Sequence, residues 1–227
     1  MAEKKQKAPS FVTPKGVFRY PALIKPDYGT KEYPKVNGEY KVSLILTEEE
    51  AQPLIEKLQP LHDAAVSEGE EKFKELKIEQ RKKLKELTVT DLYTVEYDKE
   101  TEEPTGNLIF KFSSSASGKS AKDGSTWTRK PPTLFDSKGK PLTNVSAIWG
   151  GTVGKVAFDV GSYFVGGTGL AGLKLYLTAA QIIDLVAGGS QNAAGFGFGE
   201  EEGYEAEEED TFPSETTAGA NGNQEDF

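Results

Sequence analysis

Hydrophobic and polar residues alternate along several short segments of this chain. In residues 38–46 apolar side chains occupy every second position from Tyr40 to Leu46, the pattern of a strand with one buried face. The apolar weight of residues 16–25 predicts a strand there as well, with Pro21 at a bulge or an edge. The run Lys-Pro-Asp-Tyr-Gly at residues 25–29 then predicts a turn.

The second half of the chain continues this pattern. Further strands are expected at residues 91–97, 107–117, 126–130, 133–136, 146–149, 153–160 and 173–177, with a tight turn at 136–140. Many short strands at spacings of roughly 10–15 residues are typical of an antiparallel barrel or sandwich. The fold class we expect is therefore mainly β.

One segment, residues 47–87, departs from the strand pattern and predicts a helical insertion. It begins with Thr-Glu-Glu-Glu, a capping-box sequence, and is rich in Glu, Lys, Leu and Ala. Pro53, Pro60 and Gly69 each oppose one uninterrupted helix, so two or three helical pieces are expected. The many charges of its last part indicate a solvated helix face.

The composition changes again after residue 187. Residues 188–227 contain no Ile, Leu or Val, so they bury too little apolar surface to offset the entropy of ordering. We expect a flexible N-terminus at 1–15, one domain at 16–187, and a disordered Gly-rich linker and acidic tail at 188–227.

The charge of the chain divides at the same place. The net charge is −9, yet the eleven acidic residues from Glu200 onward are accompanied by no Lys or Arg, which leaves residues 1–199 at +2. Without the insertion at 47–87, the strand-rich part carries 19 basic and 14 acidic residues. The predicted barrel is thus basic, and the acidity belongs to the tail.

Aromatic residues lie close to these basic residues in the sequence. Cations that follow a phosphate backbone, combined with aromatic faces on which bases stack, are what sequence-tolerant binding of single strands requires. The candidate contacts are Arg19, Lys25, Tyr28, Lys111, Lys119, Lys122, Trp127, Arg129, Lys130 and Trp149. Phe110 and Phe112 share a face and are expected in the core, which puts Lys111 on the other face. Trp149 fits a core and a groove equally well.

Several classes of function are not expected. The chain has no Cys and a single His, which excludes disulfides, thiolate zinc sites and a cysteine nucleophile. The Gly-x-Gly-x-x-Gly match at 167–172 precedes a strand rather than a helix, and the phosphate-loop match at 117–120 lacks its leading glycine. With no secretory signal and no membrane-length apolar run, we expect a soluble intracellular protein that does not contact a membrane. Because these motifs do not fit their context and the carboxylates are scattered, we also expect that it is not an enzyme and needs no cofactor or metal.

The acidic tail suggests two roles. A disordered polyanion tethered to a basic groove competes with nucleic acid at high effective concentration. An aromatic residue at the terminus after acidic residues suits docking into a basic, apolar pocket on another protein. The candidate tail contacts are Glu207, Glu208, Glu209, Asp210, Glu225, Asp226 and Phe227.

Taken in order, these features resemble a known family. The carriers are the segments 25–29, 40–42 (Tyr-Lys-Val), 110–112 (Phe-Lys-Phe), 136–140, Gly150-Gly151 before Gly154-Lys155-Val156, and the closing Asp226-Phe227. From about residue 16 onward the sequence is similar to the single-stranded DNA-binding proteins of short-tailed, T7-like bacteriophages.

This resemblance implies an OB-fold, a Greek-key β-barrel, with a helical insertion. It also implies binding of single-stranded DNA in phage replication, recombination and repair, strand annealing, and location in the cytoplasm of the infected bacterium. The tail would contact the phage DNA polymerase and primase-helicase and support a homodimer. Here the stretch 211–223, whose only charged residue is Glu215, thins the acidic tail. The alternative is an acidic-tailed protein-interaction or virion-associated β protein without a DNA role.

Overall fold

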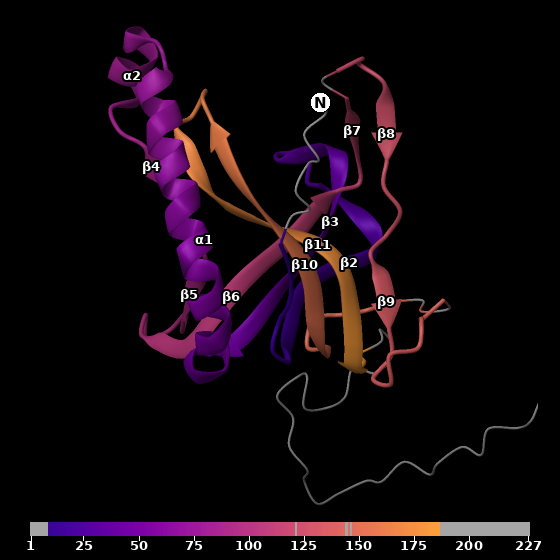
Figure 1. Ribbon diagram of the computed structural model, residues 1–227. Coiled ribbons are helices and arrows are strands. Elements are labelled where there is room, and N and C mark those ends of the chain that lie inside the picture. Colours follow the sequence, from indigo (N-terminus) through magenta and orange to yellow (C-terminus); the bar gives the residue numbers. More distant parts are fainter. Residues whose placement is uncertain (1–8, 121, 144, 146, 187–227) are drawn as a thin grey trace, which may run out of the picture. The chain divides into compact units, whose positions relative to one another are not determined.

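The structure is a computed structural model that describes residues 9–120, 122–143, 145 and 147–186 (Figure 1). The predicted tail at 188–227 lies outside these residues. The strands are β1 (Ser10–Val12), β2 (Gly16–Gly29), β3 (Pro34–Thr47), β4 (Thr88–Val89), β5 (Thr94–Tyr97), β6 (Pro104–Ser115), β7 (Ser117–Lys119), β8 (Thr126–Thr128), β9 (Thr133–Phe135), β10 (Val153–Val165) and β11 (Leu170–Asp184). The helices are α1 (Glu48–Glu75) and α2 (Ile78–Leu84).

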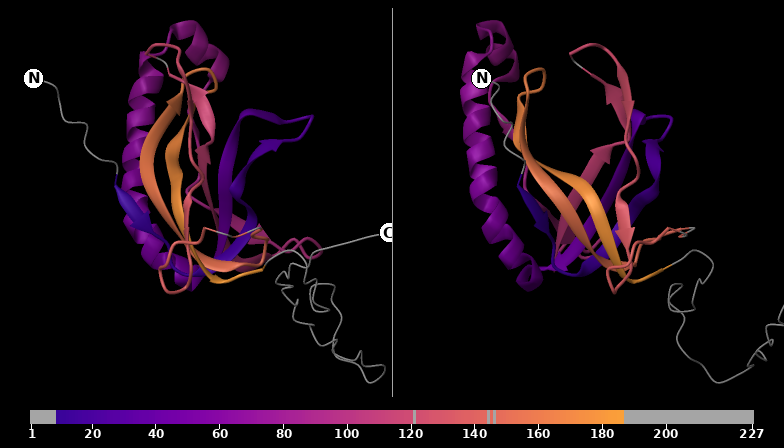
Figure 2. Two further views of the ribbon diagram at one scale, coloured as in Figure 1. Left: turned by 90° about the vertical axis from the view of Figure 1, so that its right-hand side faces the viewer. Right: turned by 45° about the vertical axis from the view of Figure 1, so that its right-hand side comes forward.

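The strands form one large, mainly antiparallel sheet in the order β4-β11-β10-β2-β3-β6-β5. β1 pairs with β10, while β4 and β9 lie parallel to β11. The sheet curls, because β11 also meets β6, where Lys174 Nζ donates a hydrogen bond to Ser113 Oγ. β7 and β8 form a separate hairpin, which the views in Figure 2 show projecting from the end of β6. The predicted mainly β class with one helical insertion is confirmed.

The core lies on the inward face of the long strands. Leu44, Phe110, Phe112 and Phe158 are almost completely buried, and the rings of Phe112 and Phe158 pack with centroids 4.8 Å apart. These residues alternate with exposed or half-buried ones, as period-2 side-chain geometry requires. The prediction that Phe110 and Phe112 share the core face is confirmed.

Helix α1 packs its buried stripe against β10 and β11. Thr47 and Glu50 form the predicted capping box, with Glu50 N donating to Thr47 Oγ1 at 3.3 Å. The segment 47–87 forms two helices, within the expected two or three pieces, but the chain breaks between α1 and α2. Breaks at Pro53, Pro60 and Gly69 are not found, because α1 continues through all three. Gly69 lies so close to β11 that an added Cβ would be 2.4 Å from Ala171 Cβ, so packing against the sheet requires glycine there. Tertiary packing thus outweighs the hydrogen bonds lost at the prolines.

Three other local expectations are corrected by the structure. Residues 25–29 continue strand β2 instead of turning, and Pro26 falls in an irregular stretch of the ladder where its missing N–H is not needed. Residues 147–149, in the segment expected as a strand at 146–149, do not form one. Trp149 N donates a hydrogen bond to Val186 O, which lies beyond the end of β11, so the segment does not extend the sheet. Residues 10–12, within the N-terminus expected to be flexible, form β1.

Candidate nucleic-acid interface

The outward face of the sheet carries a row of polar side chains across three strands. Arg19 of β2 is paired with Ser43 of β3, and Ser43 with Lys111 of β6. Each of these residues alternates with a core residue such as Leu44 or Phe110, so packing of the inner face determines which side chains point outward. The predicted contacts Arg19 and Lys111 therefore lie on one face, in register.

Arg19 is held in place by a carboxylate on the edge strand β5. Its Nη2 forms a salt bridge with Glu96 Oε1. Glu96 also accepts hydrogen bonds from Asn107 Nδ2 at 2.9 Å and Thr105 Oγ1 at 3.2 Å. The hydrogen bonds from Asn107 and Arg19 lower the pKa of Glu96, so it is ionised at neutral pH. The guanidinium is thus oriented, and its remaining donors are available to a ligand.

A second charged network lies at the far end of the same face. Glu39 pairs with Lys35 and lies 3.9 Å from Lys174 Nζ, while Asp27 pairs with Lys41. Burial opposes the ionisation of Glu39, but the hydrogen bonds from Lys35 and Ser113 and the two lysine charges outweigh it and lower its pKa. Burial lowers the pKa of Lys174, and the charge of Glu39 limits the shift. Most of the cations here are neutralised within the fold.

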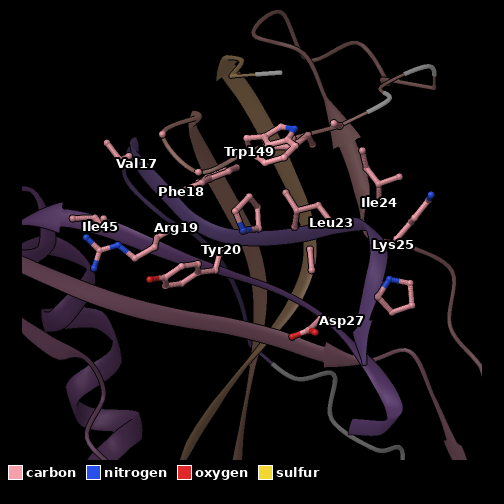
Figure 3. A pocket seen from close by; sticks show the side chains of 17 residues that line it. Val17, Phe18, Arg19, Tyr20, Leu23, Ile24, Lys25, Asp27, Ile45 and Trp149 are labelled. Atoms are coloured by element: carbon pink, nitrogen blue, oxygen red, sulfur yellow. The ribbon is translucent and has the colours of Figure 1, made fainter. Parts of the chain in front are cut away.

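A cleft of about 850 Å³ lies between β2 and residues 147–151 (Figure 3). We call it the Trp149 cleft. Its lining is mostly apolar, and Trp149 is 56% exposed. Figure 3 shows Arg19 near one end of the β2 segment and Lys25 near the other. An apolar cleft with a half-exposed indole and cations at both ends matches the requirements for stacked bases and a phosphate backbone.

Tyr20, beside Arg19, was not among the predicted contacts. Its backbone has φ +51° at a bulge where the β2–β3 register shifts between Arg19 and Ala22, and its side chain is 74% exposed. It lines the Trp149 cleft and a second cleft of about 600 Å³, the Glu96 cleft, which includes Glu96 and Ile109. The predicted bulge at Pro21 was the available signal, because a bulge redirects the neighbouring side chain.

A third cleft, of about 700 Å³, contains Lys111. This Lys111 cleft is also lined by Lys174 and by Tyr93, Tyr163 and Tyr176, and it shares Ile109 with the Glu96 cleft. The Glu96 cleft therefore adjoins the Trp149 cleft at Arg19 and Tyr20 and the Lys111 cleft at Ile109. The tyrosines come from β10, β11 and the segment before β5, so only the fold brings them next to Lys111.

The β7–β8 hairpin holds a second group of predicted contacts. Trp127 packs flat on its cross-strand partner Gly118, where an added Cβ would be 2.5 Å from the indole. The guanidinium of Arg129 lies 5.7 Å from the centre of the indole, a cation–π distance. Lys119, Lys122 and Lys130 are exposed on the same hairpin or its continuation.

The predicted contacts thus fall into two groups. Arg19, Lys25 and Trp149 line the Trp149 cleft, and Lys111 lines the Lys111 cleft, with the Glu96 cleft between the two. The others, except Tyr28, lie on the projecting hairpin or its continuation. Tyr28, near the end of β2, is exposed, and its ring packs on Gly38 of β3. The seven predicted tail contacts lie outside the described residues.

Two negative findings apply to the described part of the chain. Among residues 9–120, 122–143, 145 and 147–186, no three His, Asp or Glu side chains are grouped so that they could hold a metal ion. Over the same residues, neither helix combines the length and the apolar character needed to cross a bilayer.

The fold defines the class of an OB-fold protein. Its outward face combines basic and aromatic residues, as nucleic-acid-binding surfaces do. The family model for the single-stranded DNA-binding protein of bacteriophage T7 matches residues 16–185, so the chain belongs to this family.

Individual relatives agree with this assignment. The chain is 29% identical over 195 residues to the single-stranded DNA-binding protein of Enterobacteria phage T3, covering 84% of this chain and 78% of the relative. The crystal structure of gp2.5, a single-stranded DNA-binding protein encoded by bacteriophage T7, superposes with a TM-score of 0.59 at 25% identity, covering 88% of this chain and all of that one. The single-stranded DNA-binding protein of bacteriophage Enc34, in complex with single-stranded DNA, shares the fold at 10% identity and a TM-score of 0.50, over 78% of this chain and 88% of that one.

Proposed function

We propose that this protein binds single-stranded DNA, without strong sequence preference, along the outward sheet face and its adjoining clefts. The observation that supports this most directly is the in-register row of Arg19, Ser43 and Lys111 beside the Trp149 cleft. Membership of a family of single-stranded DNA-binding proteins supports the same ligand. Arg19 and Lys111 would contact phosphates, and Trp149 would stack on a base.

The chemistry of this face favours single strands over duplex. Stacking on Trp149 requires a base with a free face, which a paired duplex does not offer. The cleft is lined mainly by apolar groups and cations rather than by a fixed set of donors and acceptors that could distinguish one base from another. Binding should therefore tolerate any sequence and depend on salt.

The biological setting is part of the same proposal. The protein would cover single strands during replication, recombination and repair of phage DNA in the cytoplasm of the infected bacterium, and assist annealing of complementary strands. The acidic segment from Glu200 to Phe227 would compete with DNA for the basic face, recruit the polymerase and the primase-helicase, and support a homodimer. The charge split between this segment and the rest of the chain supports the competition.

A salt titration tests the electrostatic part of the proposal. Affinity for oligo-dT should fall with a log–log slope of roughly −0.7 per phosphate contacted, so contacts from Arg19, Lys25 and Lys111 predict a slope of about −2 or steeper. A gel-shift comparison should show much weaker binding of duplex DNA of the same length. A slope near zero, or equal binding of duplex, would refute the proposed site.

Deleting residues 200–227 tests the competition. The truncated protein should bind oligo-dT more tightly than the full chain, with the largest difference at low salt, where charges are least screened. Removing Phe227 alone keeps the acidic residues and is the matched control, so it should leave DNA affinity nearly unchanged while weakening association with the polymerase. Unchanged binding after the larger deletion would contradict competition by the tail.

A further inference from the structure

Tyr20 has a backbone conformation that is unfavourable for its residue type. Its φ of +51° lies in the left-handed region, which L-residues other than Gly, Asn and Asp seldom adopt. The next residue is Pro21, whose ring further restricts the residue before it to extended conformations. This bulge therefore carries a conformational cost that the rest of β2 does not.

Contacts within the fold do not account for a tyrosine at this position. The side chain is 74% exposed, so its ring buries little surface. Its hydroxyl makes no hydrogen bond with the residues that the structure describes. Glycine would adopt the same φ without strain. A strained residue that contributes little packing is more readily explained by a ligand than by stability.

The position of Tyr20 in the interface indicates what that ligand contacts. Tyr20 lines both the Trp149 cleft and the Glu96 cleft, and Arg19 lines both with it. The Arg19 guanidinium is fixed by Glu96, which Asn107 and Thr105 hold in turn. An exposed aromatic ring thus stands next to an oriented cation where two clefts meet, a pairing that suits one nucleotide, with its base on the ring and its phosphate at the guanidinium.

We propose that Tyr20 is a stacking platform for a base at the junction of the Trp149 and Glu96 clefts, and that the strained bulge holds its ring outward for this purpose. This inference rests on the proposed function, since it assigns a nucleotide position within the same face. It adds a second aromatic contact, on β2, to Trp149 on the facing segment. Because stacking accepts any base, Tyr20 extends the site without adding sequence preference.

The test compares two substitutions that both remove the ring but differ in backbone strain. In the full-length chain, Tyr20→Ala and Tyr20→Gly should each raise the Kd for oligo-dT about tenfold, as expected for loss of one stacked base. Only glycine relieves the left-handed strain, so Tyr20→Gly should melt about 2–4 °C above Tyr20→Ala. Tyr20→Trp keeps a stacking face and should retain the affinity of the unmodified protein.

Tyr33 provides the matched control. It is also a highly exposed tyrosine, at 78%, but it has no positive φ and lies outside the three clefts. Tyr33→Ala and Tyr33→Gly should leave the Kd for oligo-dT within about twofold. Their stability order should be reversed, with the glycine variant melting lower, because glycine there only adds freedom to the unfolded chain.

The outcomes separate this inference from the proposed function. If the unmodified chain fails to bind oligo-dT, the proposed function is wrong. If it binds and both Tyr20 variants bind as tightly, Tyr20 is not a stacking platform and only this inference is overturned. A Tyr20→Gly protein that melts at or below Tyr20→Ala would overturn the claim that strain holds the ring outward.

Discussion

The two faces of strands β2, β3 and β6 are made from alternate residues of the same segments, and they differ in burial and in polarity. The inward face carries Leu44, Phe110 and Phe112, which are nearly inaccessible to solvent. The outward face carries Arg19, Ser43 and Lys111, which are the immediate sequence neighbours of the buried Phe18, Leu44 and Phe110. The strands are thus specified by one face and leave the other free for function.

The difference between the two faces explains why the outward side chains are well positioned. A one-residue slip of a strand would exchange the two faces and bury lysine and arginine, so the register is strongly specified by the core. Phe112, packed against Phe158, thereby fixes where Lys111 points. The side chains of the outward face are thus positioned by packing on its reverse side.

The largest effect is expected from the inward face. Phe110→Ala should reduce the free energy of unfolding by about 3–5 kcal/mol, because it removes a completely buried ring and leaves a cavity. Denaturant unfolding followed by circular dichroism measures this. The neighbouring Lys111→Gln, on the exposed face, should change stability by less than about 0.5 kcal/mol. Equal losses of unfolding free energy for both variants would contradict the claim that the inward face, and not the outward one, stabilises the fold.

The next largest effect is expected at the Trp149 cleft. Trp149→Ala should weaken binding of oligo-dT by about 1–3 kcal/mol through loss of stacking, measured by fluorescence anisotropy of labelled DNA. Its effect on stability should be small, because the indole is half exposed. Trp127→Ala on the β7–β8 hairpin is the comparison. A larger loss at Trp127 than at Trp149 would move the main site from the sheet face to the hairpin.

Lys111→Gln should have a smaller effect on binding and a distinctive salt signature. Losing one phosphate contact should weaken binding by about 1 kcal/mol at low salt and make the log–log salt slope shallower by about 0.7. Lys57 is exposed on helix α1, away from the sheet face, and Lys57→Gln should change neither quantity. Equal losses of affinity for the two lysine variants would contradict a phosphate contact at Lys111.

The smallest effect is expected for Glu96 and concerns pH. Hydrogen bonds from Asn107 and Arg19 lower its pKa, so the ionised form stabilises the fold above the unfolded-state pKa, and this contribution disappears as pH falls through the lower folded value. Glu96→Gln should therefore be less stable than the unmodified protein at pH 7, by less than about 1 kcal/mol. In thermal melts the difference should shrink as the pH falls through the lowered pKa of Glu96. A difference independent of pH would contradict the ion pair.

The hydrophobic pattern of a segment predicted its structure correctly where that structure depends on a single strand. The alternation around Lys111 correctly separated the phenylalanines of the core from the outward lysine. The same pattern gave wrong predictions where contacts with distant parts of the chain determine the structure. Helix α1 passes through Pro53 and Pro60 because its buried stripe packs on β10 and β11, and that gain is not visible in the sequence of the helix alone.

The interface was predicted in part for the same reason. Arg19, Lys25 and Trp149 were expected as separate candidates, and the fold brings them into one cleft. Tyr176 of β11 and Lys111 line the same cleft only because the curled sheet brings β11 to β6, so their proximity could not be predicted from their neighbours in the sequence. The outward direction of Tyr20 depends on a bulge whose exact dihedral angle no composition rule supplies.

The most direct test of the central claim is lysine footprinting of the full chain with and without oligo-dT. Acetylation by a small reagent, read by mass spectrometry, reports the accessibility of each lysine in one experiment. Lys25 in the Trp149 cleft and Lys111 on the outward face should be protected by DNA, while Lys57 on α1 should react equally in both samples. Unchanged reactivity of Lys25 and Lys111 under saturating DNA would contradict the assignment of the outward face as the binding site.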